Sequence, residues 1–212
     1  MHACQLWILR LSSSGTVKLA ANRLLRHLQT GRILKAMATP VLIPVSEYLN
    51  TTYRPDRDYV DGELNERNLG EKPHGLLQGI LYSLFQNNRR EWGLLPIPEQ
   101  RVQTSATHFR IPDLCVIRPV AGELIVRSAP VLCIEVLSKD DTLENMRDRI
   151  EDYLQMGVEH IWVLDPLKHE AYQATAQGYE AVHGIMNVAG TPVRVDLNDV
   201  FQQLEDLLAG HL

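Results

Sequence analysis

Two acidic residues occupy positions where carboxylates could do chemistry. Glu135 is the only charged residue in the apolar run of residues 131–137, and Asp113 follows Pro112 directly before the apolar run of residues 114–117. An ionised carboxylate buried without a partner costs several kcal/mol, so Glu135 is expected to be functional or to have a buried Arg partner. Pro-Asp alone is a common turn dipeptide. On neighbouring strands, however, the two acids could hold Mg²⁺, which takes oxygen ligands from one or two carboxylates and water.

The spacing of apolar residues predicts the elements that must position these acids. Period-two and continuous apolar runs predict strands at residues 94–104, 114–117, 131–137 and 161–164, and hairpins at 59–64 and 171–183. Helical spacing predicts helices at residues 74–92, from Asp140 or Asp141 to Gly157, and at 199–208, with a short helical turn after Ser46. This order predicts one α/β domain with a mixed sheet flanked by helices.

Several segments in this order match a known family. They are Tyr59-Val60-Asp61-Gly62-Glu63-Leu64, His74 at a helix start, Pro112-Asp113, Glu135-Val136-Leu137-Ser138, and residues 153–158 followed by 161–166. Together they span roughly residues 41–200. This ordered set resembles the Uma-two-type restriction endonucleases, a family of the PD-(D/E)XK nuclease superfamily.

The resemblance implies a restriction-endonuclease-like fold and metal-dependent hydrolysis of phosphodiester bonds in DNA. Asp113 and Glu135 would hold Mg²⁺ or Mn²⁺, and Glu63 would be a further ligand or would orient a water. His74 would contact the phosphate or act as an acid. Without the resemblance, Glu63 is equally well explained as an exposed turn acid. A histidine at a helix start is more often a solvent-facing residue without a role, which is the alternative for His74.

One position departs from the family pattern. The lysine of the E-x-K motif is replaced by Leu137, which carries no charge. Lys139, near the strand end, and Arg149, on the following helix, are the candidates for the missing positive charge. An arginine can bind a phosphate through two hydrogen bonds but is a poor base. A solvated helix residue explains Arg149 equally well.

Composition and charge separate the first forty residues from the rest. The chain has 212 residues, enough for one domain, and residues 1–40 hold six Lys and Arg and no acid. We interpret residues 1–40 as a basic extension, poorly ordered or upstream of a true start at Met37; a basic amphipathic arm and a transit peptide are the alternatives. Residues 41–212, the predicted domain, hold 15 basic and 26 acidic residues, a balance of −11. Such a domain is poorly suited to simple electrostatic binding of DNA.

The remaining composition bears on location and on rival functions. Cys4, Cys115 and Cys133 are odd in number and show no paired motif, which predicts reduced thiols and a cytoplasmic protein. No apolar run is long enough to span a membrane. A homodimer is expected only by analogy with restriction enzymes. The main alternative is a catalytically silent nuclease-like domain that binds nucleic acid or a protein partner, favoured by Leu137 and the acidic balance. A carboxylate-pair hydrolase with another substrate is a third hypothesis.

Overall fold

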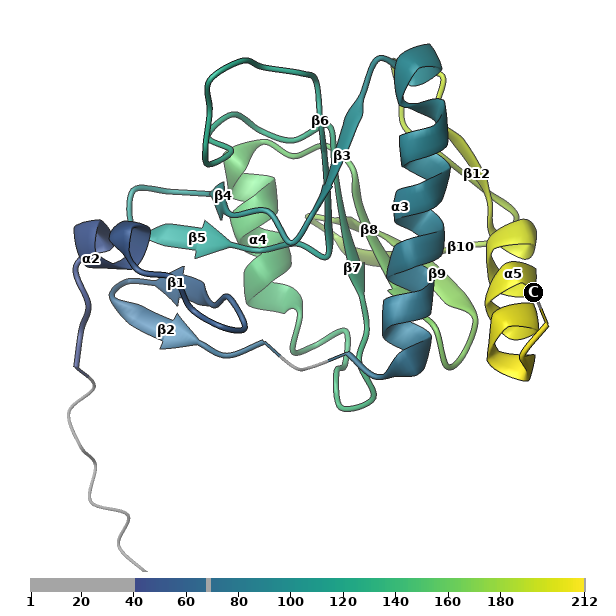
Figure 1. The fold of residues 1–212 in the computed structure, drawn as a ribbon, viewed down its shortest axis with the longest axis horizontal. Helices are drawn as coiled ribbons and strands as arrows, with labels where there is room; N and C mark the ends of the chain where they lie inside the picture. The colour runs from purple at the N-terminus through teal and green to yellow at the C-terminus, as the bar shows by residue number, and fades with distance from the viewer. Residues whose placement is uncertain (1–40, 68–69, 212) are drawn as a thin grey trace, which may run out of the picture. The chain divides into compact units, whose positions relative to one another are not determined.

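A six-stranded mixed sheet forms the centre of the protein (Figure 1). The computed structural model describes residues 41–67 and 70–211. The strand order is β10-β9-β8-β7-β6-β3, and only β7 and β8 are parallel to each other. The strands are β3 (Leu95–Pro98), β6 (Leu114–Ile117), β7 (Leu132–Val136), β8 (Ile161–Asp165), β9 (Glu170–Thr175) and β10 (Gly178–Val182). Strands β7 and β8 are buried at every position, as expected for the middle of a sheet covered on both faces.

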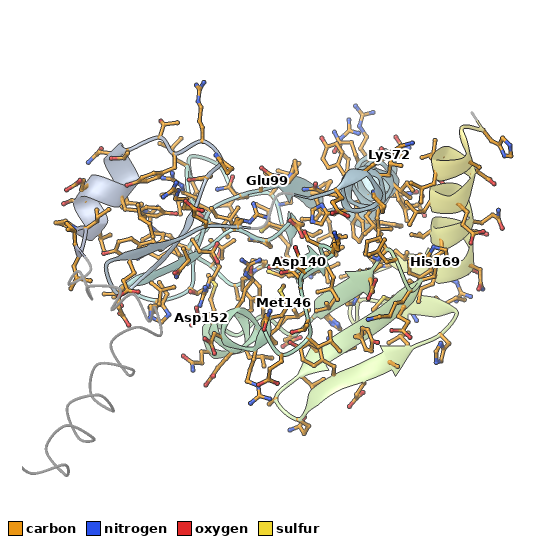
Figure 2. The ribbon with its side chains drawn as sticks, turned by 90° about the horizontal axis from the view of Figure 1, so that it is seen from below. Lys72, Glu99, Asp140, Met146, Asp152 and His169 are labelled. Atoms are coloured by element: carbon orange, nitrogen blue, oxygen red, sulfur yellow. The ribbon has the colours of Figure 1, made fainter. Side chains whose placement is uncertain are left out.

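Helices cover both faces of this sheet because alternate strand residues point to opposite sides. Leu132, Ile134 and Val136 of β7 pack with α3 (Lys72–Trp92) and α5 (Leu197–Ala209). Cys133 of the same strand packs with α4 (Arg147–Met156), which connects β7 to β8. Figure 2 shows Lys72 on α3 and Asp152 on α4 on opposite sides of the sheet. The hairpin of β11 (Ile185–Asn187) and β12 (Arg194–Asp196) leads into α5.

A smaller sheet lies beside the central one. Its order is β2-β1-β5-β4, from β1 (Asp58–Val60), β2 (Glu63–Asn65), β4 (Val102–Gln103) and β5 (His108–Arg110). Asp61 and Gly62 both have positive φ, 47° and 95°, and close the turn between β1 and β2. The rings of Tyr48, Tyr59 and Phe109 pack together beneath it, where α2 (Val45–Asn50) covers the sheet.

Most of the predicted elements are confirmed, but two predictions are wrong. The strand expected at residues 94–104 is two strands, β3 and β4, which belong to different sheets and are separated by Glu99 with a φ of 49°. The helix expected from Asp140 or Asp141 begins only at Arg147. Asp141 does not cap that helix; it accepts a hydrogen bond from the backbone N–H of Ser138 at 2.9 Å. Strands β5, β11 and β12 were not expected.

Three further predictions concern the ends and the surroundings of this domain. Cys115 and Cys133 are free and buried, as predicted. Cys4 and the predicted basic extension of residues 1–40 lie outside the described residues. Among residues 41–67 and 70–211, no helix has the length and apolar character needed to cross a membrane.

Candidate active site

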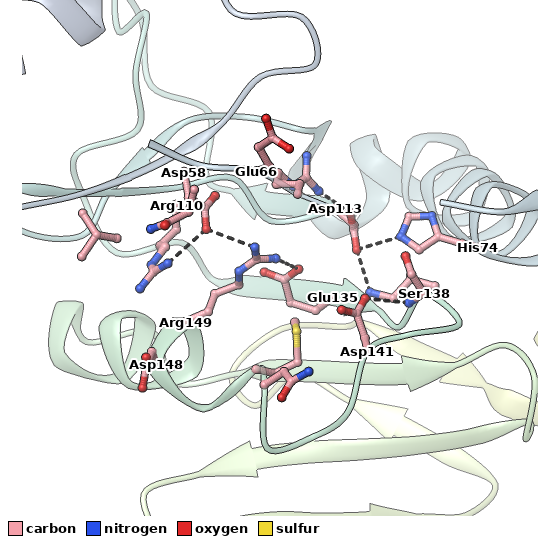
Figure 3. Close-up of a pocket in the computed structure, with 16 residues that line it drawn as sticks. Asp58, Glu66, His74, Arg110, Asp113, Glu135, Ser138, Asp141, Asp148 and Arg149 are labelled. Carbon is pink, nitrogen blue, oxygen red and sulfur yellow. Dashed lines mark hydrogen bonds and ion pairs between the residues drawn. The ribbon is translucent and has the colours of Figure 1, made fainter. Parts of the chain in front are cut away.

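Asp113 and Glu135 face each other across two hydrogen-bonded strands. Strands β6 and β7 are antiparallel with Leu114 opposite Ile134, so Asp113, one residue earlier, lies opposite Glu135, one residue later. Both side chains line a pocket of about 370 Å³, shown in Figure 3. The pocket opens between the two sheets and α4, and both predicted acids therefore belong to one site.

Asp113 is held by groups from three different parts of the chain. Its Oδ1 accepts a hydrogen bond from Nη2 of Arg67, which lies between β2 and α3. Its Oδ2 accepts from the backbone N–H of Val136 at 2.8 Å and lies 3.3 Å from Nε2 of His74, in the first turn of α3. Burial raises the pKa of Asp113, but the hydrogen bond from His74 and the charge of Arg67 outweigh it, so the net pKa is below its usual range. Asp113 is therefore an ionised carboxylate at neutral pH.

Glu135 is completely buried and has two partners on α4. The Tyr153 hydroxyl donates to Oε1 at 2.7 Å, and Nη1 of Arg149 donates to Oε2 at 2.9 Å. Burial raises the pKa of Glu135 to about 7, although the positive charge of Arg149 opposes this shift. Arg149 is thus the arginine partner that was the structural alternative for this acid, although its side chain is half-buried rather than fully buried.

Arg149 connects Glu135 to a second buried acid, Asp58. Its Nη2 lies 3.0 Å from Oδ2 of Asp58, the first residue of β1. Asp58 is 1% exposed and also accepts from Nη1 of Arg110 at 3.1 Å and from the backbone N–H of Ile111 at 3.1 Å. Arg149 is therefore no solvated helix residue: its guanidinium bridges two carboxylates at the base of the pocket (Figure 3).

The structure brings together four of the six predicted site residues. Asp113, Glu135, Arg149 and His74 line the pocket. Glu63 is exposed on β2 and does not line it, and Lys139 is exposed on the turn after β7 and does not line it either. The roles predicted for Glu63 and Lys139 remain predictions, and neither side chain is in the cluster of buried charges.

Four residues of the site were missed by sequence reasoning: Asp58, Arg67, Arg110 and Tyr153. Because side chains alternate along a strand, Asp58 lies on the same face of β1 as Val60. This alternation is the one sequence signal that could have pointed to Asp58. The ring of Tyr153 packs in the core beside α4 residues such as Ile150, but its hydroxyl reaches Glu135. Leu137, at the position of the expected lysine, is 4% exposed and packs with Tyr153 and Ile150 of α4.

The carboxylates of Asp113 and Glu135 are chemically suitable ligands for a divalent cation. Among the described residues, no group of three or more His, Cys, Asp and Glu side chains is arranged to hold a metal. Two hard oxygen donors on adjacent strands nevertheless match an ion such as Mg²⁺, which commonly takes one or two carboxylates and keeps several waters. Asp113 and Glu135 would be these ligands, provided that their oxygens become available beside Arg67 and Arg149.

Comparisons with known proteins agree with this fold. A solved structure titled "Crystal structure of a putative nuclease belonging to DUF820 from Anabaena variabilis ATCC 29413" superposes with a TM-score of 0.67 at 21% identity, covering 78% of this chain and 99% of that one. At this identity the likeness shows the fold alone. A second structure, of a DrdV–DNA complex, has a TM-score of 0.34 at 18% identity and covers 59% of this chain and 10% of that one, too weak a likeness to support a conclusion.

The family itself follows from the sequence match. No curated protein matches the chain significantly. The model of the family Uma2, described as "Putative restriction endonuclease", matches residues 45–209. This match includes every residue of the pocket described above, and the chain belongs to the Uma2 restriction-endonuclease family.

Proposed function

We propose that the protein is a divalent-metal-dependent endonuclease that hydrolyses phosphodiester bonds in DNA. The family supplies the nuclease class. The observation that carries the proposal is the pair of Asp113 and Glu135, which face each other on adjacent strands although Glu135 is fully buried in an apolar strand. Burying two neighbouring carboxylates is costly, so their retention at the base of a pocket points to a cation-dependent role.

The proposed chemistry divides between the cation and the chain. A bound Mg²⁺ or Mn²⁺ would supply a water of lowered pKa and would offset negative charge on the phosphate. Asp113 and Glu135 would hold the ion. Arg149 would fix the orientation of Glu135 through its bridge to Asp58, and it would supply positive charge in place of the absent lysine without acting as a base.

His74 is the proposed phosphate contact. Its Nε2 lies 3.3 Å from Oδ2 of Asp113 in the first turn of α3, where a helix N-terminus favours anions. Burial lowers the pKa of His74, but the hydrogen bond and the charge of Asp113 outweigh it and the net pKa is raised. A larger share of His74 is therefore protonated, which favours contact with a phosphate oxygen. Glu63 would orient a water and Lys139 would supply further positive charge, although neither side chain lines the pocket.

A homodimer in the cytoplasm completes the proposal. Two copies would let two sites meet the two strands of DNA, by analogy with other enzymes of this fold. The two buried free cysteines suit a reducing compartment.

A silent nuclease-like domain that binds nucleic acid or a protein partner is the second candidate. One observation favours it: both oxygens of Asp113 and both oxygens of Glu135 already bond to groups of the chain itself. Such a site is stable without a metal, and a domain that only binds a partner would need nothing more.

The decisive measurement is cleavage by the full-length protein and by its Glu135→Gln variant. Supercoiled plasmid, single-stranded DNA and single-stranded RNA are incubated with Mn²⁺, with Mg²⁺ or with EDTA. We expect metal-dependent cutting of DNA that falls at least about 100-fold in Glu135→Gln, since even outer-shell partners of metal sites cost about 10- to 100-fold when replaced. Glu180→Gln, which changes an exposed acid on β10, is the matched control and should cut normally.

Two other outcomes would redirect the proposal. Cutting of RNA alone would change the substrate. No cutting by the wild-type protein, together with no Mn²⁺ binding in calorimetry, would reject the enzyme and support the silent domain. Circular dichroism of each variant excludes loss of fold as the cause.

A further inference from the structure

The cations around the pocket differ in how firmly they are held. Arg149 lies on α4 and bonds to two buried acids, and Arg110 lies on β5 and also bonds to two, Asp58 and Asp152. Arg67, in contrast, lies in the segment between β2 and α3. Within the described part of the chain, Asp113 is the only acid with which it forms an ion pair. Of these three arginines, Arg67 is the one held by the fewest ion pairs, and it could leave its carboxylate with the least loss of contacts.

The two oxygens of Asp113 also differ. Oδ2 is tied to the backbone N–H of Val136 in β7, which fixes the carboxylate against the neighbouring strand. Oδ1 receives its hydrogen bond from Arg67, a side chain that lines the pocket and comes from a segment between two elements. Because Oδ1 is bonded to a side chain and Oδ2 to the backbone of a strand, Oδ1 is the oxygen whose partner can be exchanged.

We infer that the Arg67 guanidinium occupies the place of a divalent cation on Asp113, so that Arg67 and a metal ion compete for one carboxylate. This inference rests on the metal dependence in the proposed function. A guanidinium is a permanent cation with directed N–H donors, and it can neutralise a buried carboxylate that has no metal. The hydrogen bond between Arg67 and Asp113 must break before the metal binds. The apparent affinity of the protein for the metal is therefore lower than the affinity that the two carboxylates would have without Arg67.

Competition and structural support predict opposite effects of removing Arg67 on metal binding. If Arg67 only supported the site, its removal would loosen Asp113 and weaken metal binding. If Arg67 competes, its removal strengthens metal binding. Since a hydrogen bond to a charged group contributes about 1.5–3 kcal/mol, we expect a gain of roughly 10- to 100-fold.

The test is calorimetric titration of the full-length protein with Mn²⁺, without nucleic acid. Arg67→Gln should bind Mn²⁺ roughly 10- to 100-fold more tightly than the wild-type protein. Arg67→Lys keeps the charge and should gain much less. Arg57→Gln is the matched control: Arg57 pairs with the exposed Glu66, the neighbour of Arg67, so this variant loses the same charge close by without touching Asp113. It should bind like the wild-type protein.

The double variant Arg67→Gln, Asp113→Asn assigns any gain to the proposed carboxylate. The gain should disappear in it, and thermal unfolding in EDTA checks that each variant is folded. Equal or weaker binding by Arg67→Gln, an equal gain in Arg57→Gln, or a gain that survives in the double variant would overturn the inference.

The inference and the proposed function can fail separately. Metal-dependent cutting by the wild-type protein combined with unchanged Mn²⁺ affinity in Arg67→Gln rejects the competition and keeps the nuclease. Tighter Mn²⁺ binding without any cutting keeps the competition and rejects the nuclease. No Mn²⁺ binding by either protein rejects the competition, and the cleavage assay then decides the function on its own.

Discussion

The charged side chains of this site form a series of alternating acids and arginines, and each is stabilised by its oppositely charged neighbours. Glu135, Arg149, Asp58, Arg110 and Asp152 follow one another with contacts between 2.6 and 3.1 Å. Removing one member of such a series leaves its neighbours buried and uncompensated, which costs far more than an exposed pair contributes. The acids and the arginines of the pocket are therefore expected to depend on one another in stability as well as in chemistry.

Tyr153 tests this dependence without altering a charge. Tyr153→Phe removes the hydroxyl that donates to Oε1 of the fully buried Glu135. We expect the free energy of unfolding to fall by about 1–3 kcal/mol, the cost of an unsatisfied buried acceptor. Urea unfolding at neutral pH measures it. Tyr172→Phe removes a comparable but exposed hydrogen bond to Glu170 and should change little; equal effects in both variants would contradict the argument.

The sequence predicts some of these residues for a physical reason. A single acid in an apolar strand is conspicuous, so Glu135 could be found, and the motif led to Asp113 and Arg149. The partners of these residues could not be found in this way. Arg67 lies 46 residues from Asp113, and Asp58 lies 91 residues from Arg149, so only the tertiary fold brings them together. A hydrophobic pattern can assign Tyr153 to the core only as a whole residue. It cannot show that the hydroxyl of this residue bonds to an acid.

At the scale of elements, α4 determines the geometry of the site. It connects the parallel strands β7 and β8, and its residues Arg149 and Tyr153, four apart, lie on one face toward Glu135. The helix ends at Gly157, which has a φ of 94° and is followed by Val158, whose N–H bonds to the carbonyl of Tyr153. The carbonyl of Tyr153 takes part in this cap, so the position of Tyr153 depends on how the helix ends.

Replacing Gly157 with alanine tests this cap. A Cβ at this position would only make ordinary contact with Ala129 at 4.0 Å, so the cost arises from the left-handed backbone. We expect the variant to lose about 1–2 kcal/mol of stability. Gly79→Ala, in the exposed interior of α3, provides the opposite case: its Cβ meets nothing within 4 Å and should add up to about 1 kcal/mol. Differential scanning calorimetry of both variants should give melting temperatures that move in opposite directions.

Long, periodic elements were predictable and short ones were not. The helix α3 and the strands β6 to β10 have enough apolar residues to show their period. Strands β5, β11 and β12 have three residues each, too few for a pattern to stand out. The equally short β1 and β2 were predictable only because Asp61-Gly62 indicates the turn between them. The alternation through residues 99–103 indicated one strand, but Glu99 adopts a positive φ that no propensity of glutamate predicts. At Glu99 the chain leaves the central sheet and continues to the small one.

For the whole molecule, the charges of the site connect the two sheets. The small sheet carries Asp58 on β1 and His108 and Arg110 on β5. Asp113 directly precedes β6 of the central sheet, Glu135 lies on β7, and Asp152 lies on α4. Both His108 and Arg110 contact Asp152, through its Oδ1 at 2.8 Å and its Oδ2 at 2.6 Å. The pocket exists only where these parts meet, so its integrity depends on contacts that respond to ionisation.

His108 makes the association of the small sheet with α4 dependent on pH. Its Nδ1 lies 2.8 Å from Asp152 and its Nε2 lies 3.2 Å from Asp61. Burial lowers the pKa of His108, but the hydrogen bonds to both acids outweigh it, and the net pKa is above 6.5. Because the folded-state pKa exceeds the unfolded one, protonated His108 stabilises the fold fully below about pH 6.5 and loses this contribution as the pH rises through the folded-state pKa.

The free energy of unfolding should therefore fall between about pH 6 and about pH 8 by more in the wild-type protein than in His108→Gln, which cannot gain or lose this proton. Urea unfolding at several pH values in this window measures the difference between the two proteins, and the contribution of His74, present in both, cancels. His183→Gln, an exposed histidine after β10, serves as the control and should keep the wild-type slope. Parallel pH profiles for wild type and His108→Gln would show that Arg110 alone connects β5 to α4 through Asp152, with His108 adding nothing.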